Sequence, residues 1–95
     1  MSKQNAYSDA EMHMIDILIS SLEEVTNPPI EIKNLKKDIC SFGREFKLAS
    51  IGLESLSILE LCINLEFNHS IILSPEIYLS FDDINDFLCA IKTSR

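Results

Sequence analysis

The chain has 95 residues and a formal net charge of −7, from 15 acidic and 8 basic residues. A chain of this length forms one small domain that buries a little over ~60% of its unfolded surface, which leaves hardly enough room for a deep enzyme cleft. The negative charge disfavours binding to nucleic acid or to an anionic membrane surface, since both need clustered Lys and Arg. A basic patch on a partner protein is a better electrostatic match.

The composition favours helices over strands. Hydrophobic residues make up 46% of the chain, and it holds only two Gly and three Pro. A turn-rich β sandwich needs more of both, so we expect helices joined by a few loops. No apolar run reaches ~18 residues, so we expect no membrane span. The polar first residues do not resemble a signal peptide.

The three cysteines, Cys40, Cys62 and Cys89, are odd in number and widely spaced, with no Cys-x-x-Cys pair. The two histidines, His13 and His69, lack the spacing of metal ligands. We therefore expect three free thiols in a reducing cytoplasm, and neither a structural disulfide nor a zinc site.

We expect residues 1–8 to form an N-terminal tail that leads into a first helix over 9–25. The run from Ser8 to Glu11 reads as a capping box, in which the Ser side chain and the Glu side chain each bind a free backbone N–H. The run Asn27-Pro28-Pro29 stops the helix, because proline cannot donate an N–H. Spacings of three and four place one set of apolar residues on a single helix face: Ile15, Leu18, Ile19, Leu22 and Val25.

A long connection over residues 26–52 follows, with a weak stripe for a short amphipathic helix that Gly43 is placed to end. The stripe consists of Ile32, Leu35, Ile39 and Phe42. The local charge is basic, from Lys33, Lys36, Lys37, Arg44 and Lys47. Two interpretations stay open. The favoured one is a surface strap pinned over the core by its apolar residues with its lysines in water, and the other is a specific anion site.

Residues 55–68 contain no Gly or Pro and carry apolar side chains at nearly every angle. A helix with this pattern is either buried on more than one side or offers an apolar strip to a partner. We interpret Ile71-Ile72-Leu73 as buried loop packing, because nothing else in the chain would pair with it as a strand.

Two further helices are expected in the last quarter of the chain. Ser74-Pro75-Glu76 starts a short helical turn through about Leu79, with Pro at a favoured first position. The run Ser80–Asp83 reads as a second capping box, for a last helix over 81–92. Its inward stripe consists of Ile84, Phe87, Leu88 and Ile91. Residues 93–95 would be a C-terminal tail.

The stretch Gly52-Leu53-Glu54-Ser55-Leu56 is the candidate functional site of the sequence. The glycine permits a tight turn, and the serine then lies at a helix N-terminus, where unpaired N–H groups and the helix dipole favour a negative group on the hydroxyl. An activating base for Ser55 is not evident, since the motif is not Gly-x-Ser-x-Gly and His69 lies roughly 20 Å along the same helix. We therefore do not expect the chain to be an enzyme.

This stretch resembles the Gly-x-Asp-Ser-Leu motif of acyl carrier proteins, and the resemblance extends over about residues 9–92. Leu59-Glu60-Leu61 and Leu65-Glu66 follow at the spacing of that family's second helix. The run 72–76 is similar to the entry into the family's short third helix, and 80–88 is similar to its fourth helix.

The resemblance implies an all-α, four-helix carrier bundle with a long first loop and a short third helix. Ser55 would carry 4′-phosphopantetheine, transferred from coenzyme A by a phosphopantetheinyl transferase, and the thiol of this arm would hold an acyl chain as a thioester. Partners would dock on Glu54, Leu56, Leu59, Glu60, Ile63 and Glu66. Leu61 and Leu65 would be core residues and, with Ile84, would line an expandable pocket for the chain.

Some positions differ from the family pattern. Glu54 stands where the family usually has Asp, which bears on recognition by some transferases. Ser57 and Phe67 occupy positions that are often acidic in fatty-acid carriers, so docking is expected to depend more on apolar contact.

The run Phe46–Leu56 is similar to discrete carriers of type II polyketide synthases. It implies a ketosynthase with its chain-length factor, an acyltransferase or a ketoreductase as partners, which a monomer would meet in transient, salt-sensitive complexes. Three alternatives stay open. They are a carrier for primary fatty-acid synthesis, an aminoacyl carrier (although the Gly-Gly-x-Ser of peptidyl carriers is missing), and an unmodified helical interaction module.

Overall fold

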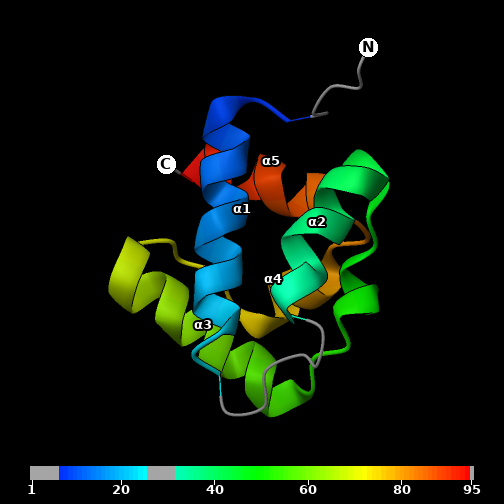
Figure 1. Cartoon of the computed structure of the whole chain (residues 1–95). Helices are drawn as coiled ribbons and strands as arrows, with labels where there is room; N and C mark the ends of the chain where they lie inside the picture. Colours follow the sequence, from blue (N-terminus) through cyan, green and yellow to red (C-terminus); the bar gives the residue numbers. More distant parts are fainter. Residues whose placement is uncertain (1–6, 26–31, 95) are drawn as a thin grey trace.

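The structure is a computed structural model that describes residues 7–25 and 32–94 (Figure 1). Over these residues the fold is all-α, as the sequence predicts, and the one β-type pairing is an isolated bridge between Lys47 and Asp83. None of the helices in the described ranges is long and apolar enough to cross a membrane. The helices are α1 (Asp9–Leu22), α2 (Ile32–Phe42), α3 (Ser55–His69), α4 (Pro75–Ser80) and α5 (Ile84–Ser94), with two 3-10 turns, η1 (Gly43–Glu45) and η2 (Leu48–Ile51).

Helix α1 begins with the predicted capping box. The Ser8 hydroxyl accepts a hydrogen bond from the Glu11 N–H at 3.2 Å, and the Glu11 carboxylate accepts one from the Ser8 N–H at 3.0 Å. The helix ends at Leu22, earlier than the predicted residue 25, because the N–H groups of Glu24 and Val25 bond to carbonyls three residues back and tighten the last turn. The predicted stop at 27–29 lies outside the described residues.

Tyr7 and Ser8 belong to the fold, which corrects the prediction of a tail over residues 1–8. The Tyr7 side chain is buried, and its hydroxyl donates to the Ile39 carbonyl of α2 at 3.1 Å. The guanidinium of Arg44 lies 5.6 Å from the Tyr7 ring centroid, in cation–π geometry. The chain is therefore anchored to its core before α1 begins.

The weak apolar stripe at 32–42 does form a helix, α2, which lies beside α1 (Figure 1). Leu35 and Ile39 are buried, and Gly43 follows the helix with a φ of 85°. Phe42 was wrongly placed in the buried stripe, since it is exposed and packs edge-on against Phe46 at 6.2 Å. With α2, the described residues form one helix more than a four-helix description contains.

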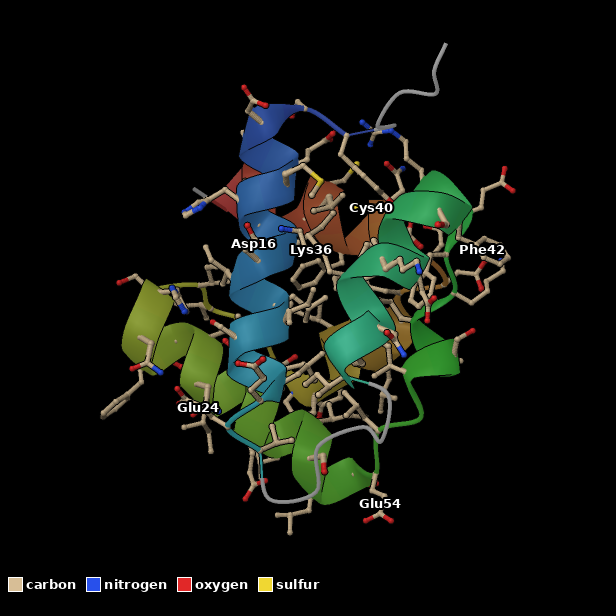
Figure 2. All side chains as sticks on the ribbon, in the orientation of Figure 1. Asp16, Glu24, Lys36, Cys40, Phe42 and Glu54 are labelled. Atoms are coloured by element: carbon tan, nitrogen blue, oxygen red, sulfur yellow. The ribbon has the colours of Figure 1, made fainter. Side chains whose placement is uncertain are left out.

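Cations of the basic segment are paired with acids from other elements. Lys36 and Asp16 meet between α2 and α1 at 2.7 Å (Figure 2), and Lys47 binds Asp82 at 2.8 Å. Arg44 binds the buried carboxylate of Glu11. These pairings with the chain's own carboxylates support the strap interpretation over an anion site.

Helix α4 begins as predicted. Ser74 is its N-cap and accepts a hydrogen bond from the Ile77 N–H at 3.2 Å, with Pro75 as the first helical residue. Burial alternates along the segment that precedes this helix. Ile71 and Leu73 are buried as predicted, whereas Ile72 is 73% exposed and was wrongly assigned to the core.

Helix α5 starts at Ile84, so the predicted start at 81 and the capping box at 80–83 were wrong. The cap lies three residues later, where the Asp83 carboxylate accepts a hydrogen bond from the Asp86 N–H at 3.1 Å. The helix also continues to Ser94. Most of the predicted tail at 93–95 is therefore helical.

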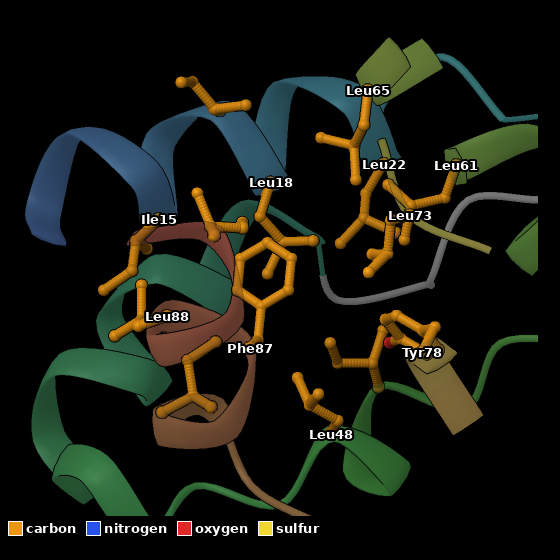
Figure 3. Close-up of a cluster of buried hydrophobic side chains, with 14 of the residues drawn as sticks. Ile15, Leu18, Leu22, Leu48, Leu61, Leu65, Leu73, Tyr78, Phe87 and Leu88 are labelled. Atoms are coloured by element: carbon orange, nitrogen blue, oxygen red, sulfur yellow. The ribbon is translucent and has the colours of Figure 1, made fainter. Parts of the chain in front are cut away.

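The core fills the space between α1, α2, α3 and α5, and α4 closes it at one end (Figures 1 and 3). Leu18 of α1, Leu61 of α3 and Phe87 of α5 are fully buried. Leu65 and Ile84 are also fully buried, so Leu61 and Leu65 are core residues as predicted. This core determines which side of α3 remains outside.

Candidate modification site and docking surface

The turn before α3 depends on Gly52. This residue ends η2 in the left-handed region, with φ 75° and ψ 36°, and its N–H donates to the Ala49 carbonyl at 3.1 Å. A Cβ built at Gly52 would meet nothing within 4 Å. The glycine is therefore required by the backbone conformation and not by lack of space.

Ser55 is the first residue of α3 and is exposed. The N-cap is Glu54, whose backbone is extended and whose side chain makes no capping hydrogen bond. Figure 2 shows Glu54 pointing away from the body of the molecule. The first turn of α3 thus lacks the side-chain cap that Ser8 and Ser74 supply to α1 and α4, and its N–H groups give this end a partial positive charge.

No described residue beside Ser55 would make it a nucleophile. Its hydroxyl makes no hydrogen bond to another described residue, and His69 is the last residue of the same helix. Within residues 7–25 and 32–94, no three side chains of His, Cys, Asp or Glu gather as metal ligands would. The arrangement leaves the Ser55 hydroxyl accessible at the start of α3.

An apolar ridge runs along the outer side of α3. It consists of Leu56, Leu59, Ile63 and Phe67, whose spacings of three and four place them on one side of the helix. Their exposed fractions lie between 44% and 86%, with Phe67 the most exposed. The three apolar residues named from the sequence as docking candidates, Leu56, Leu59 and Ile63, therefore lie together, and Phe67 extends them.

The acidic docking candidates belong to the same helix. Glu54 and Glu66 are exposed, and Glu60 is half-buried. The prediction that Ser57 is a surface position where a carboxylate is missing was wrong. It is 1% exposed, and a buried carboxylate without a cation would be strongly destabilising. Of the two positions, only Phe67 therefore lies on the outer surface of α3.

A cavity of ≈ 220 Å³ lies beside the start of α3. Leu48 and Gly52 form one part of its lining, Ile58 of α3 a second, and Tyr78 of α4 a third. We refer to it as the inner cavity. It was not predicted from the sequence, because residues 26 to 30 positions apart in the chain converge there.

A second hollow, of ≈ 300 Å³, lies between α3 and the segment before α4. Its lining includes Leu59, Cys62, Ile63, Ile72 and Pro75, with Glu66 beside them. The predicted pocket residues, Leu61, Leu65 and Ile84, line neither hollow and are packed inside the core.

Two buried titratable groups adjoin these hollows. Burial raises the pKa of the Cys62 thiol to about 11 and raises the pKa of the Tyr78 hydroxyl well above its usual range. Both groups are therefore uncharged at pH 7. Cys40, Cys62 and Cys89 are all free thiols, and only Cys89 is exposed.

The candidate residues from the sequence meet on one element. Glu54 and Ser55 lie at the N-terminal end of α3, and the ridge follows along its outer side. No protein-family model, curated protein or solved structure matches the chain. The function is therefore inferred from the chain's own residues and geometry.

Proposed function

We propose that the chain is an acyl carrier protein in which Ser55 carries a 4′-phosphopantetheine arm. The observation that supports this proposal best is the exposed Ser55 hydroxyl at the first residue of α3, directly after the turn at Gly52. In this assignment α1, α3, α4 and α5 correspond to the four helices of a carrier. Helix α2 then belongs to the long first loop.

The chemistry of attachment suits this position. In a phosphopantetheinyl transferase, the Ser55 oxygen would attack the β-phosphorus of coenzyme A and release adenosine 3′,5′-bisphosphate, while the hydroxyl proton passes to a base of the transferase. The new phosphodiester carries one negative charge. The uncapped N-terminal turn of α3 would stabilise that charge through its N–H groups and its dipole.

Partner enzymes would dock on the apolar ridge and on the acids beside it, Glu54, Glu60 and Glu66. A matching surface is an apolar patch bordered by Lys and Arg. Because the ridge includes Phe67, removal of the acids would lower the association rate more than it raises the dissociation rate. The cargo we propose is a polyketide or a related acyl chain passed between enzymes of a type II synthase. Identification of the enzyme that loads the arm would distinguish this cargo from a fatty-acid or an aminoacyl cargo.

The test is the intact mass of the protein after incubation with coenzyme A and a broad-specificity phosphopantetheinyl transferase. We expect one phosphopantetheine on the wild type and none on Ser55→Ala. Ser50→Ala is the matched control, because Ser50 is an exposed serine in the neighbouring turn η2 and its loss should leave modification intact.

Absence of any mass gain, while a control carrier is fully converted, would count against the proposal unless Glu54→Asp restores it. Restoration by Glu54→Asp would show that the longer side chain at this position requires a dedicated transferase. No gain in either protein would favour the second candidate, an unmodified interaction module. The exposed apolar ridge supports that candidate too, and it predicts that Ser55→Ala leaves partner affinity unchanged.

A further inference from the structure

The inner cavity lies within reach of a chain attached to Ser55. Gly52 and Leu53 in its lining precede Ser55 by three and two residues, and Ile58 follows one helical turn later. Tyr78 of α4 forms a further part of the lining. Most of these side chains are apolar, so an acyl chain would leave water on entering.

The Tyr78 hydroxyl is the exception in these apolar surroundings. The residue is 5% exposed, and its hydroxyl has no hydrogen-bond partner among the described residues. Its ring extends from α4 toward the buried cluster that includes Leu48 and Leu73 (Figure 3). Most buried hydroxyls in folded proteins are paired, because an unpaired one loses its hydration without compensation. The hydroxyls of Ser21 and Ser57 are also buried without a partner among the described residues, but of the three residues only Tyr78 lines the inner cavity, where an entering group could supply a partner.

We infer that the Tyr78 hydroxyl donates a hydrogen bond to an oxygen atom of the carried chain, so that the inner cavity favours oxygenated acyl chains over saturated ones. This inference rests on the proposed function, since the chain would reach the cavity from Ser55. A carbonyl or hydroxyl oxygen on the chain would accept the phenolic proton. A saturated chain would fill the same space and leave the hydroxyl unpaired, which makes Tyr78 a positioning residue for the cargo.

The experiment compares carriers loaded with octanoyl pantetheine amide or with its 3-oxo, 5-oxo and 7-oxo derivatives. For each chain, the readout is the folding equilibrium constant of the loaded carrier in urea divided by that of the unloaded carrier. We then divide this factor for an oxo chain by the factor for the saturated chain, which gives the oxo-to-saturated ratio. For at least one oxo position, we expect this ratio to be about 2-fold to 10-fold higher in the wild type than in Tyr78→Phe. That oxo position would report how deep the hydroxyl lies.

Ser21→Ala is the matched control. Ser21 also has a buried hydroxyl without a partner among the described residues, but it belongs to α1 and does not line the inner cavity. Its removal should leave the oxo-to-saturated ratio unchanged. In the unloaded protein, Tyr78→Phe should keep or raise the folding equilibrium constant, because it removes an unpaired hydroxyl.

Equal ratios in wild type and Tyr78→Phe for all three oxo positions would overturn the inference. So would a 10-fold or greater loss of folding in unloaded Tyr78→Phe, since this would mean that ordered water or another group already pairs with the hydroxyl. Intact masses separate the two proposals. If every protein carries its pantetheine but the ratios are equal, only the inference fails, and if no pantetheine is attached, the proposed function fails with it.

Discussion

At the scale of single residues, Cys62 shows how burial changes chemistry. It lies on α3 and lines the hollow beside the ridge, yet the residue is only 5% exposed. Desolvation disfavours the thiolate, which raises the pKa of the thiol from 9.0 to about 11. Since the thiolate is the reactive form, thiol reagents should modify the exposed Cys89 before Cys62.

The pKa of Cys62 predicts a loss of stability at alkaline pH. The unfolded chain loses this proton near pH 9 and the folded chain keeps it to about pH 11, so the unfolding free energy falls as pH rises through that window. Between pH 8 and pH 10 the fall should be about 1 kcal/mol. Urea unfolding at both pH values measures it.

Cys62→Ala should remove most of this slope, and Cys89→Ala should retain it because the buried Cys62 is still present. Smaller parts belong to Tyr7, whose pKa burial raises to about 12, and to Tyr78, whose pKa burial also raises, and these parts persist in both variants. An identical slope in wild type and Cys62→Ala would show that the buried thiol does not titrate as described.

At the scale of elements, both ends of α3 depend on left-handed residues. Gly52 precedes the helix, and Ser70 ends it with a φ of 58°. The N–H of Ser70 donates to the Glu66 carbonyl at 3.1 Å, which is the single hydrogen bond of the αL cap motif, and the N–H of Ile71 donates to the Leu65 carbonyl at 3.1 Å. Gly is the usual residue at this left-handed position, because a Cβ is strained there.

Ser70→Gly should therefore stabilise the protein, by about 0.5–1 kcal/mol, since it relieves left-handed strain in the folded state. The control is the same change within a helix. Ser20→Gly in α1 should destabilise by about 1 kcal/mol, because glycine there adds only backbone entropy to the unfolded chain. Thermal unfolding of both variants tests the opposite signs, and a loss of stability in Ser70→Gly would contradict this account of the cap.

At the scale of the whole molecule, a cluster around Arg44 ties together parts of the chain that are far apart in sequence. Its guanidinium binds the Glu11 carboxylate of α1 at 3.1 Å and the Asn85 side chain of α5 at 2.8 Å. It also lies over the ring of Tyr7. Glu11 is 2% exposed, whereas the Arg44 side chain is 41% exposed. The two partners therefore differ in how easily each returns to water.

This asymmetry predicts which substitution costs more. Arg44→Ala leaves a buried carboxylate without its cation and should lower the unfolding free energy by about 2–4 kcal/mol. Glu11→Gln should cost only about 1–2 kcal/mol, because the half-exposed guanidinium can turn to water. Urea unfolding measures both. Lys36→Ala, which removes an exposed pair, is the control and should cost much less than Arg44→Ala. An Arg44→Ala protein as stable as Lys36→Ala would rule out this role.

Local signals were predicted well from the sequence. The caps at Ser8 and Ser74, the glycine after α2 and the start of α3 each depend on hydrogen bonds or backbone angles within a few residues. The start of α5 was missed because two possible N-cap patterns overlap there, Ser80 with Asp83 and Asp83 with Asp86. Asp83 supplies the cap instead of Ser80. Periodicity also assigned Phe42 to the buried stripe, although it is the exposed last residue of α2. Ile72 was assigned to buried loop packing because it had no strand partner, yet it lies exposed between α3 and α4.

By itself the sequence determined the helical class, the short amphipathic helix within the long connection and the position of Ser55 at a helix start, because these follow from neighbouring residues. Only the tertiary structure decided which side of α3 faces outward and therefore that Ser57 is buried and Phe67 exposed. It also decided the partners of Arg44 and the placing of Tyr78 beside the inner cavity. These features depend on contacts between residues tens of positions apart, which no local pattern specifies.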